Sequence, residues 1–219
     1  MSGVQGLDIQ DLLIRAPVIL FSLTVHEFMH AWTAWKCGDD TALRAGRVTL
    51  NPMAHLDLIG TICLFVGPIG WAKPVPVDST NFPYETRRRD DLLVSGAGVA
   101  ANFALGVLCA LLLRYFSAPI LAVDQVGPSI WGMVFYGSFI NFALAIFNLL
   151  PIPPLDGSHI LKNILPLNAA ILYTNMNRYG IYALLAFVLV NRFIAQAVGF
   201  SLLGYPVTQL VRAFSGFEL

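Results

Sequence analysis

Residues 16–35 read APVILFSLTVHEFMHAWTAW, an apolar run of about the 20 residues that a helix needs to cross a bilayer. The run contains the pattern HExxH, formed by His26, Glu27 and His30. Positions i and i+4 of a helix lie one above the other, so both histidines can offer a ring nitrogen to one metal ion while Glu27 lies beside it. Such groups cost roughly a few kcal/mol each in hydrocarbon and occur there mainly where they coordinate, pair or line water. The run therefore predicts a zinc site inside a membrane helix.

The composition of the whole chain is that of a membrane protein. Hydrophobic residues make up 57% of the 219 residues and charged residues 12%, and the mean hydropathy of +0.69 is too high for a soluble domain. We expect one all-α, polytopic membrane domain, 1–219, built as a helical bundle of about four to six membrane segments. Basic and acidic residues balance at 13 each and the basic ones are scattered, which excludes a nucleic-acid-binding face.

Hydropathy predicts three further spans, at about 92–113, 130–150 and 179–211. Asn191 and Arg192 interrupt the last of them, which leaves either one long tilted helix or two shorter elements. The segment 58–71 has only 14 residues and is broken by glycines, so it suits a re-entrant or interfacial element. Before it, the alternation in RVTL, 47–50, predicts a short strand. Short re-entrant and β structure is therefore expected after the first span.

The second span carries small residues at four-residue spacing, which would let another helix approach closely. They are Gly96, Gly98, Ala100, Asn102, Gly106 and Ala110. We therefore expect this helix at the centre of the bundle.

The distribution of basic residues predicts the orientation in the cell membrane, because Lys and Arg accumulate in cytoplasmic loops. Those between the first two spans are Lys36, Arg44, Arg47, Lys73, Arg87, Arg88 and Arg89. The next loop has only Arg114, at its edge. The first loop should then be cytoplasmic, and the third span returns the chain to the same side. We expect the site to open toward the cytoplasm.

A catalytic zinc site uses three protein ligands and a water, so the two histidines need a third ligand from elsewhere in the chain. Asp156 is the best candidate, because it follows PIPP, 151–154, and broken backbone at membrane depth is tolerated only within protein or around a wet cavity. The alternatives are an aspartate that caps the next helix and histidines that bond to carbonyls or to neighbouring helices. His55 and His159 could also bind metal, but we rank them lower, His55 as a loop residue or a neighbour of the ligands and His159 as helix surface.

Two motifs together, HEFMH at 26–30 and NLLPIPPLDG at 148–157, resemble the site-2 protease family of intramembrane zinc metalloproteases, in its compact form without a PDZ or CBS domain. The resemblance implies that His26, His30 and Asp156 bind one Zn²⁺ per chain and that Glu27 is the catalytic base. It also implies cleavage in or near transmembrane segments of membrane-anchored substrates. The family's central motif GPxxN is here GVAAN, 98–102, with a valine in place of the proline.

Amide donors would help to stabilise the developing oxyanion, and Asn102 and Asn148 are the candidates. The strand at 47–50 would bind an unwound substrate by strand addition. An intramembrane metal or ion transporter is an alternative, because His, Asp and Asn also mark ion paths, and so is a catalytically silent relative that binds transmembrane helices. Expected partners are transmembrane substrates and the lipid bilayer, with a homo-oligomer left open.

Overall fold

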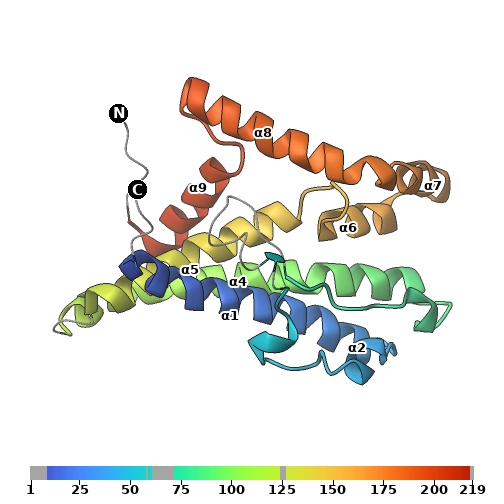
Figure 1. The fold of residues 1–219 in the computed structure, drawn as a ribbon, viewed down its shortest axis with the longest axis horizontal. Helices are drawn as coiled ribbons and strands as arrows, with labels where there is room; N and C mark the ends of the chain where they lie inside the picture. The colour runs from blue at the N-terminus through green and yellow to red at the C-terminus, as the bar shows by residue number, and fades with distance from the viewer. Residues whose placement is uncertain (1–8, 58, 61–71, 124–126, 218–219) are drawn as a thin grey trace.

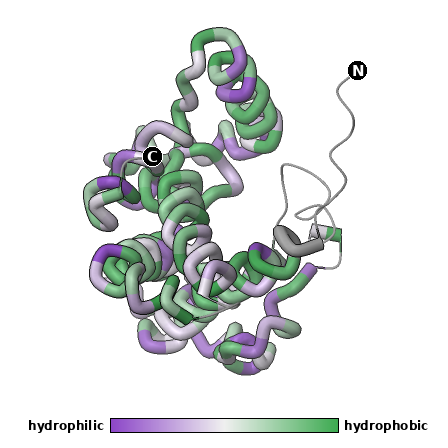
Figure 2. The backbone as a smooth tube through the Cα atoms, turned by 90° about the vertical axis from the view of Figure 1, so that its left-hand side faces the viewer, coloured by the Kyte–Doolittle hydropathy of each residue, from purple (hydrophilic) through white to green (hydrophobic). Residues whose placement is uncertain are grey.

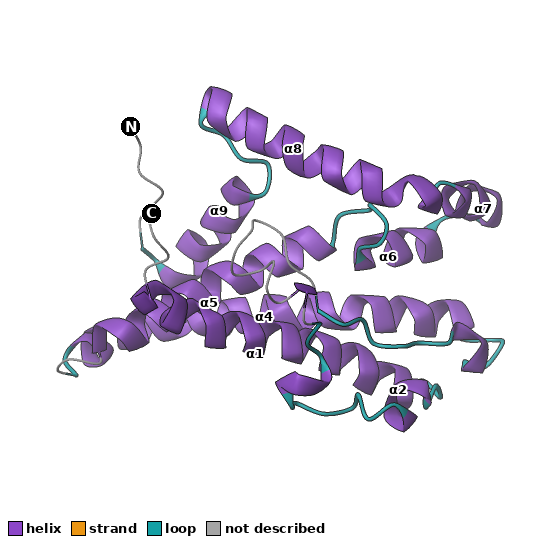
Figure 3. Ribbon diagram, viewed as in Figure 1, coloured by secondary structure: helices purple, strands orange, loops and turns teal. Residues whose placement is uncertain are grey.

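The computed structural model of the chain describes residues 9–57, 59–60, 72–123 and 127–217. Its helices and helical turns are α1 (Ile9–Lys36), α2 (Thr41–Arg44), η1 (Pro52–Ala54), η2 (Ser79–Asn81), α4 (Arg87–Leu121), α5 (Gly127–Asn148), α6 (Asp156–Ile164), α7 (Leu167–Asn175), η3 (Asn177–Tyr179), α8 (Gly180–Val198) and α9 (Gly204–Ser215). Figure 3 shows no strand in this part of the chain, where the only β pairing is an isolated bridge between Leu56 and Ala72. The all-α expectation is confirmed.

Helices α1, α4 and α5 lie side by side and form the centre of the molecule (Figure 1). Helix α4 packs against both of the others, as expected of the second span, and α9 packs across α4 and α5. Four of the buried residues of α4 form one four-residue series, Gly98, Asn102, Gly106 and Ala110. A Cβ on Gly106 would lie 2.8 Å from the Phe142 ring of α5. The residues on this face of α4 are therefore small because α5 approaches it closely.

Three helical segments are long and apolar enough to cross a membrane, among the residues that the structure describes: Arg87–Leu121, Gly127–Asn148 and Leu167–Val198. The first two contain the predicted spans 92–113 and 130–150. Helix α1 contains the predicted span 16–35 but is not one of the three, and its apolar run is interrupted by His26, Glu27 and His30. The described residues thus contain three candidate membrane spans, fewer than the four to six membrane segments that we expected.

The predicted span 179–211 consists of two helices, which is one of the two alternatives that the sequence left open. Gly199 ends α8 in the left-handed conformation, with φ at +69°, and the chain turns back into α9. The third candidate span is instead formed by α8 together with α7, which precedes it.

Helix α8 is nearly uncovered by the rest of the chain. Large apolar side chains such as Leu189 and Phe193 are 67% and 71% exposed, and Figure 2 shows hydrophobic residues along most of the helical segments. Surfaces of this kind suit a lipid environment. The one buried residue of α8 is Gly180, which lies so close to Pro153 that a Cβ would be 2.5 Å from its carbonyl oxygen.

The prediction of a strand at 47–50 is wrong. Its first residue, Arg47, is buried, and its guanidinium donates to the carbonyl oxygens of Lys73 and Pro74, at 2.5 and 3.3 Å. The side chain thus holds the extended segment 72–78, and residues 47–50 form bends around it. Strand addition at 47–50 loses its structural basis. The predicted re-entrant element at 58–71 lies almost entirely outside the described residues.

Asp39 fixes the other end of segment 72–78 to the end of α1. Its fully buried carboxylate accepts four hydrogen bonds, two from Thr41, one from the Asp78 N–H at 2.8 Å and one from Asn81 Nδ2 at 2.7 Å. Burial alone would raise the pKa of the Asp39 carboxyl, but these hydrogen bonds outweigh it and hold the pKa below its ordinary value. Asp39 is therefore ionised at neutral pH and stabilises the loop structure.

We expect Asp39→Ala to lower the free energy of unfolding by about 1–3 kcal/mol, because it removes four hydrogen bonds to a buried carboxylate. Asp40→Ala is the matched control, since Asp40 makes only an exposed pair with Arg44 that is worth about 0.5 kcal/mol or less. The lowered pKa means that the Asp39 contribution is complete above the unfolded-state pKa of about 3.9 and is lost as the pH falls through the folded-state value. Denaturation in detergent at pH 7 and below pH 4 measures both effects; equal losses for the two variants at pH 7 would contradict the assignment.

Candidate metal centre

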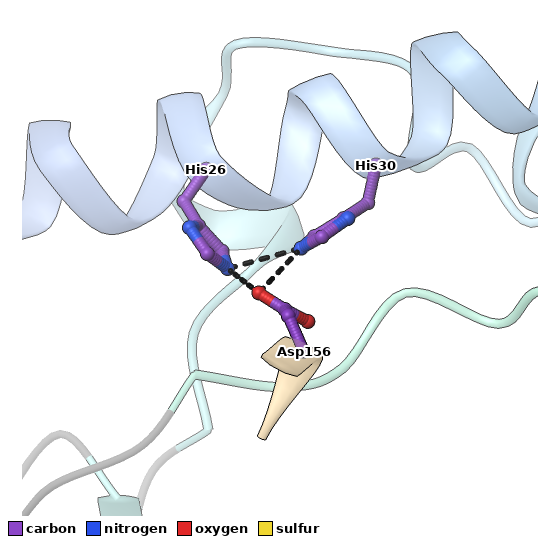
Figure 4. Close-up of side chains that lie close together, drawn as sticks. All are labelled: His26, His30 and Asp156. Atoms are coloured by element: carbon purple, nitrogen blue, oxygen red, sulfur yellow. Dashed lines mark hydrogen bonds and ion pairs between the residues drawn. The ribbon is translucent and has the colours of Figure 1, made fainter. Parts of the chain in front are cut away.

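Two histidines of α1 and the first residue of α6 bring three ligand atoms together (Figure 4). The Nε2 atoms of His26 and His30 lie 3.0 Å apart, and Asp156 Oδ2 lies 3.2 and 3.3 Å from them. Both histidines are buried. The structure thus brings together the two histidines at i and i+4 of α1 and the aspartate that follows the proline-rich run.

Hydrogen bonds on the far side of each imidazole determine which ring nitrogen carries the proton. His30 Nδ1 lies 2.7 Å from the Val94 carbonyl oxygen, which can only accept, so Nδ1 is the protonated nitrogen. His26 Nδ1 lies 2.6 Å from Asn102 Oδ1, which likewise accepts. In the neutral rings both Nε2 atoms therefore present lone pairs toward Asp156.

The three facing atoms are thus all acceptors. Asp156 Oδ2 is buried and has no hydrogen-bond donor among the described residues. Acceptors this close repel one another unless a cation lies between them. Ligands of a tetrahedral zinc ion, at about 2.0–2.1 Å from the metal, are about 3.3–3.4 Å apart, which matches the observed separations. The residues fit zinc, with the fourth position left open.

The loop between α5 and α6 sets the position of Asp156. Helix α5 ends at Asn148, and a Cβ on Gly157 would collide with the carbonyl oxygens of Leu149 and Leu150. The glycine of the LDG motif is thus required for the tight turn that places Asp156 at the start of α6. Polar contacts then tie the helix to α4: Arg88 Nε donates to the Asn163 carbonyl at 2.7 Å, and Asn163 Nδ2 donates to Asp91 at 2.8 Å.

Gly98 of α4 lies directly against both histidines. A Cβ there would be 2.5 Å from His30 Nε2 and 2.6 Å from His26 Cε1. Only glycine lets α4 pass this close without moving the rings. The sequence marked Gly98 as one of several small residues but gave no sign that it contacts the metal ligands, because the contact joins two distant helices.

Glu27 lies beside the three ligands, half-buried, on the wall of a cavity of about 470 Å³. The cavity is lined by residues of α1, α4, α5, α6 and the extended segment that starts at Ala72. In that segment the N–H of Val75 donates to Glu27 Oε2 at 3.1 Å. Its neighbours Pro74 and Pro76 have no N–H to offer.

The other candidates lie around this centre in different ways. Asn102 was expected to face the oxyanion, but its oxygen accepts from His26 and its amide nitrogen donates to Ser22 and Asn141. Asn148 lines the cavity, and its amide donates to the Leu144 carbonyl at 3.1 Å.

Neither of the two other histidines joins the ligand cluster. His159 is exposed at the cavity mouth, as expected of helix surface. His55 is buried and contacts the Thr49 carbonyl with Nε2 at 2.8 Å, within the loop that leads to segment 72–78.

Comparisons with known proteins find relatives named as zinc metalloproteases. The sequence model of peptidase family M50 matches residues 118–191, a range that includes Asp156. The chain is 39% identical over 169 residues to the protein named "Putative zinc metalloprotease YwhC" from Bacillus subtilis (strain 168), and the alignment covers 74% of each chain.

The chain is also similar to two mycobacterial proteins named "Putative zinc metalloprotease Rip2". It is 36% identical over 143 residues to that of Mycolicibacterium smegmatis and 37% identical over 143 residues to that of Mycobacterium tuberculosis. These alignments cover 63% of this chain and 52% of each Rip2 protein. No solved structure matches.

We expect Gly98→Ala to weaken zinc binding by about 10-fold or more, because the added methyl group displaces the two imidazoles from the common ligand position. Gly96→Ala is the matched control: it adds the same methyl group to the same helix, where a Cβ meets nothing within 4 Å. Zinc content and chelator competition on the purified variants measure the difference. Equal affinity in the two variants would show that the histidines do not depend on this contact.

Proposed function

The chain belongs to peptidase family M50, the site-2 protease family of zinc metalloproteases, and we propose that it hydrolyses peptide bonds in or near transmembrane segments of membrane-anchored proteins. The observation that carries the proposal is the convergence of three acceptor atoms beside a carboxylate that lines a cavity. Two of the helices that line the cavity, α4 and α5, are long and apolar enough to cross a membrane, which supports access for a substrate within the bilayer.

In this proposal His26, His30 and Asp156 hold one zinc ion, and Glu27 is the general base. Zinc in such a site lowers the pKa of a water molecule and polarises the scissile carbonyl. Glu27 takes a proton as the water attacks the carbonyl carbon and passes it to the amine nitrogen when the carbon–nitrogen bond breaks. Asn148, on the cavity wall, is the remaining amide near the reacting carbonyl.

We propose that the cavity opens on the cytoplasmic side of the cell membrane. The support is the concentration of basic residues from Lys36 to Arg89, in the loop before α4 and in its first turn, against Arg114 alone in the second half of α4. A helical substrate hides its peptide bonds in its own hydrogen bonds, so part of it must unwind before it can lie in the cavity.

We expect Glu27→Gln to reduce cleavage of a single-span membrane reporter by about 100-fold or more while one zinc ion per chain is retained. Glu85→Gln, which changes an exposed glutamate, is the control and should cleave normally. Reporter cleavage in membranes and zinc content of the purified proteins are measured together. Full cleavage by Glu27→Gln would show that Glu27 is not the general base. A wild-type protein without zinc would favour one of the alternatives, a catalytically silent helix-binding relative or an ion transporter.

The Val75 N–H is expected to hold Glu27 in position for proton transfer. Val75→Pro removes this donor and should lower kcat by about 10-fold or more, with KM and zinc content little changed, because a hydrogen bond to a charged group is worth about 1.5–3 kcal/mol. Val75→Ala keeps the N–H and is the control. If both variants lose the same activity, the side chain of Val75 matters and its amide does not.

A further inference from the structure

Behind the metal centre, a closed set of polar side chains joins α1, α4 and α5 within the apolar core. Its members are Ser22, Asn102 and Asn141, which are between 0 and 2% exposed. Asn102 Nδ2 donates to Asn141 Oδ1 at 2.8 Å and to the Ser22 carbonyl at 3.3 Å. Asn141 Nδ2 donates to Ser22 Oγ at 2.8 Å and to the Gly137 carbonyl at 2.9 Å. Each amide hydrogen of the pair has an acceptor.

The direction of the hydrogen bonds in this set follows from two backbone carbonyl groups, that of Gly137 beside Asn141 and that of Ser22 beside Asn102. The Gly137 carbonyl can only accept, so the nitrogen of Asn141 must face it and the Asn141 oxygen must face Asn102. The Asn102 nitrogen must then face Asn141, which turns the Asn102 oxygen toward His26. Ser22 agrees with this direction, because its hydroxyl donates to the Val18 carbonyl at 2.8 Å and so accepts from Asn141.

The reversed arrangement would act directly on the metal ligand. With Asn141 flipped, its oxygen would face the Gly137 carbonyl, and Asn102 would have to flip as well. Asn102 would then offer N–H groups to His26 Nδ1, and the ring proton would move to Nε2, the atom that faces Asp156. The side chains of this set are at most 2% exposed, so bulk solvent would not relieve the cost of placing amide oxygens against the Gly137 and Ser22 carbonyls.

We propose that Asn141 is a positioning residue of the metal centre: through Asn102 it keeps the proton of His26 on Nδ1 and so keeps the Nε2 lone pair directed at the metal position. The proposal rests on the zinc site of the proposed function. It assigns Asn141 a role although the residue does not line the cavity. His30 needs no such relay, because the Val94 carbonyl fixes its Nδ1 proton directly.

Asn141→Leu tests the proposal, because leucine fills a similar volume without hydrogen-bonding groups. Zinc affinity should fall by about 10- to 100-fold. In zinc-free protein labelled with ¹⁵N-histidine, the His26 signals should change from the Nδ1-protonated form to a mixture, while those of His30 stay as in the wild type. Ser138→Ala is the control: Ser138 is buried on the same helix and its hydroxyl has no partner among the described residues. Unchanged affinity and unchanged His26 signals in Asn141→Leu would overturn the proposal.

A second variant separates this role from a general loss of packing. A carboxylate can only accept, so Asn102→Asp should hold the His26 proton on Nδ1 without help from Asn141. In the Asn102→Asp background, Asn141→Leu should therefore change zinc affinity by less than about 2-fold. An equal loss of affinity in both backgrounds would assign Asn141 a packing role and overturn the proposal. If the wild type itself binds no zinc, the proposed function fails; if it binds zinc and Asn141 has no effect, this inference alone fails.

Discussion

The arrangement of the central helices depends on one electrostatic constraint: three acceptor atoms face one another, and the described residues offer no donor to the Asp156 oxygen among them. The two Nε2 atoms and the Asp156 oxygen lie 3.0–3.3 Å apart, and contacts with other parts of the chain fix the position of each. Hydrogen bonds to Val94 and Asn102 fix the rings, Gly98 gives them room, and the turn at Gly157 delivers the carboxylate. The bundle therefore places partial and full negative charges close together, and a bound cation would stabilise this arrangement.

A second, polar framework surrounds the cavity on the loop side. Arg47 and Asp39 hold segment 72–78 at its two ends, and the segment touches Glu27 through one backbone amide. Loop residues that are far apart in sequence thus determine the position of the candidate base. The ligands and the base are supported by different parts of the chain, so each can be disturbed without the other.

The sequence was sufficient for the features that depend on local spacing. HExxH on a helix, the small-residue series of α4 and the aspartate after the proline-rich run all lie within a few turns of chain, and the structure brings the two motifs together. What could not be predicted depends on contacts between distant segments. Arg47 looked like a strand residue because its partners, the carbonyl groups of Lys73 and Pro74, are more than 20 residues away. The contact of Gly98 with His26 and His30 has no local signal either. The segment 179–211 is divided into two helices because Gly199 ends α8, and the mean hydropathy of the segment gives no sign of such a helix end.

The near absence of protein contacts on α8 has a mechanical consequence. Most of its surface is free of protein contacts, and Gly180 against Pro153 is its buried contact with the loop that carries Asp156. Pro153 lies three residues before Asp156 in the chain. A tilt of α8, such as a change in membrane thickness would favour, would therefore act on Pro153 through Gly180, at the base of the loop that carries the carboxylate.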